Sequence, residues 1–238
     1  MCFSAEVSYT AAALLLPAGI VSLSKAWRTD RRYLAICALP FLFGLQQLFE
    51  GLVWNAGAVH DSGAVTRYSL AYMFFSWLAW PVWVPVSVYF LEPNRRKPLY
   101  LGFAILGAVL GGAEYLPYFA HEGWLTVSFQ PHAIVYGGVE LFDFLASRYF
   151  TYTLYVSAVI VPLLLASKPE IKIFGILVAL VVVVTYNFFW FAYISVFCFG
   201  RALMSFYLVG MIFWVARRPQ HVIRHDPGLK HPALFGIN

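Results

Sequence analysis

Residues 40–54 have the sequence PFLFGLQQLFEGLVW, in which two amides and a carboxylate interrupt a run that is otherwise apolar. In a helix, residues separated by three, four, seven or eight positions return to the same side, so the polar positions of this run share one face. They are Gln46, Gln47, Glu50 and Trp54. An ionisable group inside an apolar helix is costly and marks a candidate functional site. We therefore predict that this face points into a helix bundle and lines a pocket.

The rest of the chain is equally apolar. Of its 238 residues, 61% are hydrophobic and 11% are charged, whereas about a quarter of the residues of a soluble domain are charged. This composition excludes an ordinary soluble protein and predicts an integral membrane protein that crosses the bilayer several times.

Apolar runs long enough for one crossing, roughly 17 to 25 residues, divide the chain. They are residues 5–25, 33–56, 67–91, 98–120, 149–167, 171–190 and 195–216. Merging the last two would leave six crossings, but together they are about twice as long as one crossing requires. We predict an all-α, seven-helix transmembrane domain over residues 1–216, followed by a tail over residues 217–238.

The basic residues predict the orientation. Under seven crossings, most of them fall on one side: Lys25, Arg28, Arg31, Arg32, Arg95, Arg96, Lys97, Lys168, Lys172, Arg217, Arg218, Arg224 and Lys230. Because basic loops stay in the cytoplasm, the N-terminus should lie outside and the tail inside, in the inner (plasma) membrane. These residues are spread over short loops and form no basic stripe, so nucleic acid is not an expected partner.

With this orientation, the polar residues of the predicted crossings gather in the outer half of the membrane. They are Cys2, Glu6, Gln46, Gln47, Glu50, Glu114, Asn187, Cys198 and Arg201. Cys198 and Arg201 are three residues apart and share a helix face. An arginine inside a crossing requires a partner, and we predict that Arg201 contacts Glu50 directly or through one water molecule.

Three tryptophans, Trp77, Trp80 and Trp83, recur at helical spacing beside two prolines in the third crossing. Aromatic residues of membrane proteins usually concentrate at the two interfaces, so this mid-segment cluster suggests a cavity lining. The alternative is bulky packing around a helix that proline distorts.

The longest loop, residues 121–148, should be structured. Residues 125–129 and 133–136 flank a turn and predict a small hairpin. An apolar loop of this kind has to pack on the helix ends, where it would form a lid over the pocket or serve only as structure. Its possible contributors to the pocket are His121, Glu122, His132, Glu140 and Asp143.

Three motifs carry a resemblance to a known family. They are the start MCFSA, the segment QQLFEGLVW over residues 46–54, and SVFCF over residues 195–199. Together they resemble an uncharacterised family of small bacterial multi-pass membrane proteins. The resemblance implies no activity.

Two functions from different classes remain open. The first is an enzyme at the outer face, in which Glu50 and Arg201 act on a small molecule and the thiols of Cys2 and Cys198 bind zinc or copper. The second is a sensor or structural subunit in which a buried ion pair fixes helix packing. A transporter would be expected to have polar groups along a whole path or an inverted repeat, and the sequence has neither.

Overall fold

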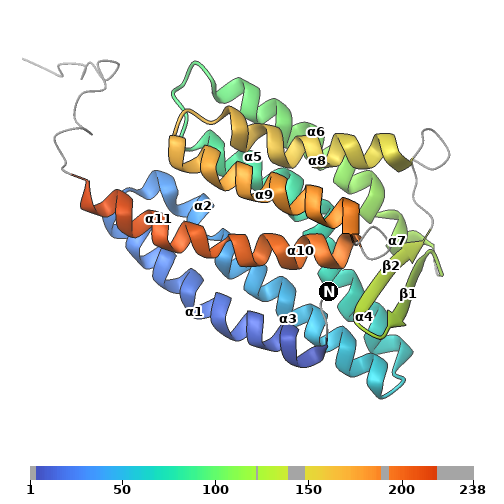
Figure 1. The fold of residues 1–238 in the computed structure, drawn as a ribbon. Coiled ribbons are helices and arrows are strands. Elements are labelled where there is room, and N and C mark those ends of the chain that lie inside the picture. Colours follow the sequence, from blue (N-terminus) through green and yellow to red (C-terminus); the bar gives the residue numbers. More distant parts are fainter. Residues whose placement is uncertain (1–3, 122, 139–147, 189–192, 219–238) are drawn as a thin grey trace, which may run out of the picture.

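The computed structural model describes residues 4–121, 123–138, 148–188 and 193–218, and the fold within them is mostly helical (Figure 1). Its elements are α1 (Ala5–Thr29), η1 (Arg31–Tyr33), α2 (Leu34–Cys37), α3 (Leu39–Ala58), α4 (Ser62–Met73), η2 (Phe74–Ala79), α5 (Trp80–Tyr89), α6 (Lys97–Tyr115), α7 (Pro117–Ala120), β1 (Leu125–Gln130), β2 (Ala133–Gly138), α8 (Arg148–Leu165), α9 (Pro169–Phe188), α10 (Tyr193–Met204) and α11 (Phe206–Arg217).

Six helical segments of the described chain are long and apolar enough to cross a membrane, and a shorter apolar helix covers residues 150–165. This agrees with the predicted multi-pass membrane protein. The last two predicted crossings, residues 171–190 and 195–216, are not merged into one helix. They contain two separate helices, α9 and α10, which pack against each other.

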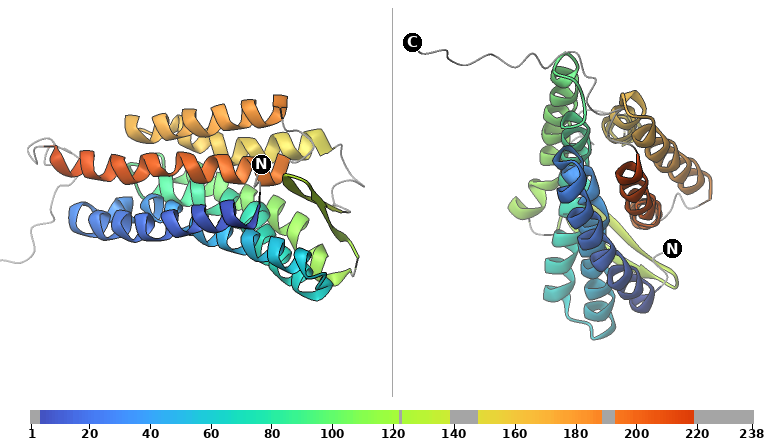
Figure 2. Two further views of the ribbon diagram at one scale, coloured as in Figure 1. Left: turned by 60° about the horizontal axis from the view of Figure 1, so that its bottom comes forward. Right: turned by 90° about the vertical axis from the view of Figure 1, so that its left-hand side faces the viewer.

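The helices form two layers, which the right panel of Figure 2 shows from one end. One layer contains α1 and the helices α3 to α6, and the other contains α8, α9 and the α10–α11 pair. Contacts of α5 and α6 with α8, and of α1 with α11, join the layers. The interior between them is therefore lined by residues from both halves of the chain.

Glycines allow the closest helix approaches. A Cβ on Gly107 would lie 2.1 Å from the Pro81 carbonyl oxygen, and one on Gly111 would lie 2.2 Å from that of Trp77. Pro81 and Pro85 have no N–H, so they offer no helical hydrogen bond to the carbonyls four residues before them, Trp77 and Pro81. Two small residues four apart allow helices to approach closely, and here the approach occurs where prolines leave carbonyls without a helical donor.

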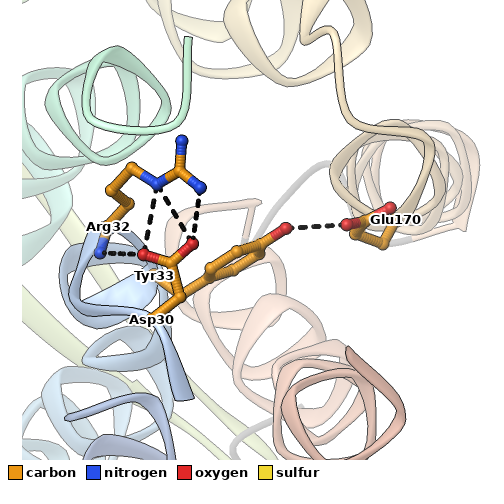
Figure 3. A network of polar contacts seen from close by, with 4 residues as sticks. All are labelled: Asp30, Arg32, Tyr33 and Glu170. Carbon is orange, nitrogen blue, oxygen red and sulfur yellow. Dashed lines mark hydrogen bonds and ion pairs between the residues drawn. The ribbon is translucent and has the colours of Figure 1, made fainter. Parts of the chain in front are cut away.

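A polar network joins the corner after α1 to the start of α9 (Figure 3). The Tyr33 hydroxyl donates to Glu170 Oε1 over 2.8 Å, and Arg218 Nη2 lies 3.6 Å from Glu170 Oε2. Asp30 accepts hydrogen bonds from Arg32 and pairs with its Nη2 at 2.9 Å. Partial burial raises the pKa of Asp30, but the hydrogen bonds and charge of Arg32 outweigh it and hold that pKa below its ordinary value.

A second network lies at the same end of the bundle. Ser167 donates from both its N–H and its hydroxyl to the carboxylate of Glu92, the hydroxyl over 2.6 Å. Arg96 Nη1 donates to the Leu165 carbonyl over 3.3 Å. The turns that carry the basic residues are thereby joined at one end of the bundle, as the sequence predicts for loops on one side of a membrane.

The predicted hairpin forms from β1 and β2, which pair in antiparallel register from Leu125 opposite Gly138 to Gln130 opposite Ala133. Strand β2 is the more buried of the two and contacts α10, while β1 contacts α4. Tyr136 stacks on Tyr72 with ring centroids 4.7 Å apart. The hairpin therefore packs on helices from both layers at the end opposite the basic turns (Figure 1).

Candidate functional site

Helices α3, α8, α10 and the π-helical turn η2 converge on one buried polar cluster. A π-turn widens the helix by one residue and is frequent at functional sites. Here it places Ser76 and Trp77 in the interior, at 5% and 4% exposure. The Tyr155 hydroxyl of α8 donates to the Ser76 carbonyl. One of the carbonyls disturbed by the π-turn is thus satisfied by a neighbouring helix.

A chain of polar contacts runs from α5 through α3 and η2 to α10. Trp80 Nε1 donates to Gln46 Oε1 over 3.0 Å, and Gln46 Nε2 donates to Ser76 Oγ over 2.9 Å. Ser76 Oγ lies 3.4 Å from Cys198 Sγ, and Arg201 Nη2 donates to that sulfur over 3.2 Å. The i,i+3 proximity predicted for Cys198 and Arg201 is confirmed.

Arg201 is the largest charged group in this interior, and it is only 2% exposed. Its guanidinium carbon lies 3.9 Å from the ring centroid of Phe197, 5.8 Å from that of Trp80 and 5.9 Å from that of Phe43. The hydroxyl of Tyr155 also interacts with it. Within the described residues, Nε and Nη1 of Arg201 have no hydrogen-bond partner. A buried cation is thus held mainly by rings, a hydroxyl and a sulfur.

A narrow cavity lies beside this guanidinium. The space open to the centre of a water molecule is ≈ 20 Å³, and it is lined by Ser76, Trp77, Tyr155, Phe197, Cys198 and Arg201, among others. A single water needs roughly 10–15 Å³ on this measure. The cavity therefore has room for one or two water-sized groups beside the charge. Of the three tryptophans, Trp77 lines this cavity and Trp80 joins its polar network, whereas Trp83 is partly exposed elsewhere.

The polar face of α3 is buried. Gln46, Gln47 and Glu50 each have 0% exposure, and Gln47 Nε2 donates to Glu50 Oε2 over 3.3 Å. Within the described residues, the contacts of Arg201 do not include a direct ion pair with Glu50. Contact between the two through one water molecule stays a prediction.

The structure does not bring the remaining predicted residues into the cavity lining. Glu114 is buried on α6, one turn beyond the close approach at Gly111. Trp54 is half-buried and packs on Phe129 of the hairpin, with ring centroids 5.6 Å apart. Glu6 is exposed in the first turn of α1, where Ser4 Oγ donates to it over 2.9 Å.

Asn187 also lies away from the cluster, and Cys2 cannot be placed relative to it. Asn187 is exposed and donates to the Val183 carbonyl of its own helix over 2.7 Å. Cys2 lies outside the described residues, as do Glu122, Glu140 and Asp143 of the loop.

The expectation of zinc or copper is not supported by the described residues, which contain no group of three or more His, Cys, Asp or Glu side chains able to hold a metal ion. The thiol of Cys198 has Ser76 and Arg201 as neighbours, and neither is a metal ligand of the expected kind. The thiol therefore belongs to the hydrogen-bond network of the cavity.

Among the cavity residues that sequence reasoning missed are two whose hydroxyls join the polar cluster, Ser76 and Tyr155. Serine and tyrosine occur widely in membrane helices, and nothing in their local sequence shows that they face a cation on another helix. The buried carboxylates Glu92 and Glu170, at 4% and 1% exposure, were also missed, because they flank predicted crossings where carboxylates are usually solvated.

Comparisons with known proteins place the chain in a family but give it no activity. Residues 1–226 match the family described as a family of unknown function, DUF6629. Searches of curated proteins and of solved structures found no match. Because the match extends over nearly the whole sequence, the chain belongs to the family of unknown function DUF6629.

Proposed function

We propose that this protein is a multi-pass membrane binding protein whose ligand presents a small anionic group, such as a halide or a carboxylate, to Arg201. The observation that carries the proposal is the 2% exposed guanidinium beside a cavity, with two nitrogens that have no partner among the described residues. The sequence left open an enzyme and a sensor or structural subunit. The proposal follows the second of these, except that a bound ligand, in place of an ion pair within the protein, compensates the buried charge.

The energetics of a buried charge support a ligand. An arginine in a membrane interior is expensive and is normally paired or faces water. The contacts of Arg201 are hydrogen-bonding and aromatic, and those within the described residues supply no carboxylate. An anion in the cavity would supply the negative charge that the described neighbours of this guanidinium lack.

The shape of the cavity limits the ligand. A space of ≈ 20 Å³ for water-sized centres admits one small group. Its walls include the rings of Trp77, Tyr155 and Phe197, which leave little room for a hydrated or multivalent ion. We therefore expect a monovalent anion, or the single carboxylate of a larger molecule whose remainder lies outside the cavity.

The proposal includes an orientation. We infer that seven segments cross the plasma membrane, that the hairpin and the N-terminus lie outside, and that the basic turns and the tail lie in the cytoplasm. The ligand site then lies nearer the outer side, beneath the hairpin. Support comes from the shared end of the bundle at which the basic turns meet.

The test is ligand-induced stabilisation of the purified protein in detergent. Thermal unfolding is followed in gluconate and then in chloride, nitrate or formate at equal ionic strength. A ligand at one hundred times its dissociation constant stabilises the folded state by about 2.7 kcal/mol. We expect at least one small anion to raise the melting temperature of the wild type and of Arg67→Met, an exposed-arginine control.

The same anion should have no such effect on Arg201→Met. The proposal is overturned if no small anion stabilises the wild type, or if Arg201→Met responds equally. Cys198→Ser separates binding from thiol chemistry, because the hydroxyl can still accept from Arg201. We expect this variant to retain the anion response.

A further inference from the structure

A second, larger hollow lies at the basic end of the bundle, and it shares no lining residue with the Arg201 cavity. It is a groove of ≈ 700 Å³ whose lining residues come from the last turns of α1, from α2 and the residue that follows it, and from α5. The residues that matter here are Leu23, Trp27, Arg28, Ala35, Ala38 and Trp83, all of which line it. Pockets that bind small molecules typically have volumes of roughly 300–1,000 Å³.

The groove continues an apolar face of α1. Ile20 and Trp27 are 54% and 57% exposed, and their separation of seven residues places them on one side of the helix. In a chain that crosses a membrane, such a face is covered by lipid tails. One end of the groove therefore opens toward the hydrocarbon, and the other reaches the basic turn that follows α1.

Two tryptophans are fixed as walls of this groove. Trp83 Nε1 donates to the Ala35 carbonyl over 2.8 Å, and Arg31 lies 4.1 Å from the ring centroid of Trp27. Trp83 is still 37% exposed. Tryptophans held in this way, with one side apolar and the other near charge, are typical of the headgroup level of a membrane.

The charge of the groove comes from Arg28. Its neighbours at this corner are committed elsewhere: Arg32 pairs with Asp30 at 2.9 Å (Figure 3), and Arg31 lies on Trp27. Lys25 lies 5.5 Å from the ring centroid of Phe213. Within the described residues, Arg28 is exposed and belongs to none of the ion pairs. Its guanidinium is therefore available to a phosphate at the mouth of the groove.

We propose that this groove binds one anionic phospholipid, with the phosphate on Arg28 and an acyl chain along Leu23, Ala38 and Trp83. The mainly apolar volume, the two tryptophans and the uncommitted cation correspond to the chain, the interface and the headgroup of such a lipid. A small soluble anion would leave most of the ≈ 700 Å³ of the groove unfilled. A zwitterionic lipid would place a second positive charge near Arg28 and Arg31.

The test uses quenching of tryptophan fluorescence by brominated lipids. The full chain, in detergent micelles, is titrated with dibrominated phosphatidylglycerol or with phosphatidylcholine carrying the same chains. A juxtamembrane basic residue near an anionic surface strengthens binding roughly fivefold. We expect phosphatidylglycerol to quench the wild type at about one fifth of the lipid concentration that phosphatidylcholine requires.

Variants assign the quenching to this groove. Arg28→Gln should remove the preference for phosphatidylglycerol, whereas Arg95→Gln, an exposed arginine on the next basic turn, should keep it. Ala38→Phe should fill the groove. The double change Trp27→Phe and Trp83→Phe should remove the difference in quenching between phosphatidylglycerol and phosphatidylcholine. Equal quenching by both lipids in the wild type, or equal loss of preference in Arg28→Gln and Arg95→Gln, would overturn the proposal.

Discussion

Replacement of Arg201 by methionine should stabilise the ligand-free protein. The change removes two guanidinium nitrogens that have no partner among the described residues, each of which costs about 1–3 kcal/mol when buried. It also removes the contact with Phe197 at 3.9 Å, which is worth about 2 kcal/mol when desolvated. Methionine fills a similar volume with an apolar, flexible side chain. These terms give a net gain of about 0–4 kcal/mol.

The assay is chemical denaturation in detergent, with gluconate as the anion so that the cavity holds no small ligand. The measured quantity is the free energy of unfolding of the wild type and of Arg201→Met. A loss of about 3–5 kcal/mol in place of a gain would show that Arg201 has a charged partner. The reasoning from an uncompensated cation would then be refuted.

A double-mutant cycle with Glu50→Gln identifies that partner. If Glu50 and Arg201 interact through one water molecule, the two changes together should cost less than the sum of the single changes. Additive effects would show that the two side chains do not interact energetically. They would leave Glu50 as part of the Gln47 contact on α3.

Three further predictions concern packing, pH and orientation. Gly111→Ala should destabilise the fold by about 1–3 kcal/mol in the same unfolding assay, because its Cβ would lie 2.2 Å from the Trp77 carbonyl oxygen. Gly102→Ala on the same helix is the control. A Cβ there would meet nothing within 4 Å, so this change should be neutral or stabilising. Since the folded-state pKa of Asp30 is lowered, its pairing should stabilise the protein above the ordinary carboxyl pKa, about 3.9, and lose that effect as the pH falls through the lowered value. Asp30→Asn should therefore be less stable than the wild type at pH 7 and approach it in acid. Reporter fusions should place the 121–148 loop outside and the tail inside, and a cytoplasmic loop would reverse the proposed orientation.

Periodicity was sufficient to predict the helices and the polar face of α3. Gln46, Gln47 and Glu50 are all fully buried, because an amphipathic pattern in a membrane helix directly reports which side meets other helices. The hairpin was also predictable, since its strands are close in sequence and joined by a short turn. In both cases the relevant contacts depend on local spacing.

The cavity could not be predicted, because its walls come from three helical segments, η2, α8 and α10, whose rotation the sequence does not specify. Asn187 illustrates the difficulty. Thr185 is 1% exposed, and two further residues rotate the helix by about 200°, so Asn187 lies on the opposite, exposed side. The π-turn over Phe74–Ala79 adds another shift, since its one extra residue rotates the helix that follows by about 100°.

The buried carboxylates at the basic end of the bundle and the buried guanidinium of Arg201 have different kinds of partner, and this difference bears on function. At the basic end, the carboxylate of Glu92 accepts from Ser167, and that of Glu170 accepts from Tyr33 and pairs with Arg218. Each of these groups joins segments distant in sequence, which is sufficient reason for a buried charge in a structural role. Arg201 makes its described hydrogen bond within its own helix, to Cys198, and is otherwise surrounded mainly by rings. Because that arrangement leaves a guanidinium largely uncompensated beside an open cavity, the charge is better explained by something that enters the cavity than by the packing of the helices.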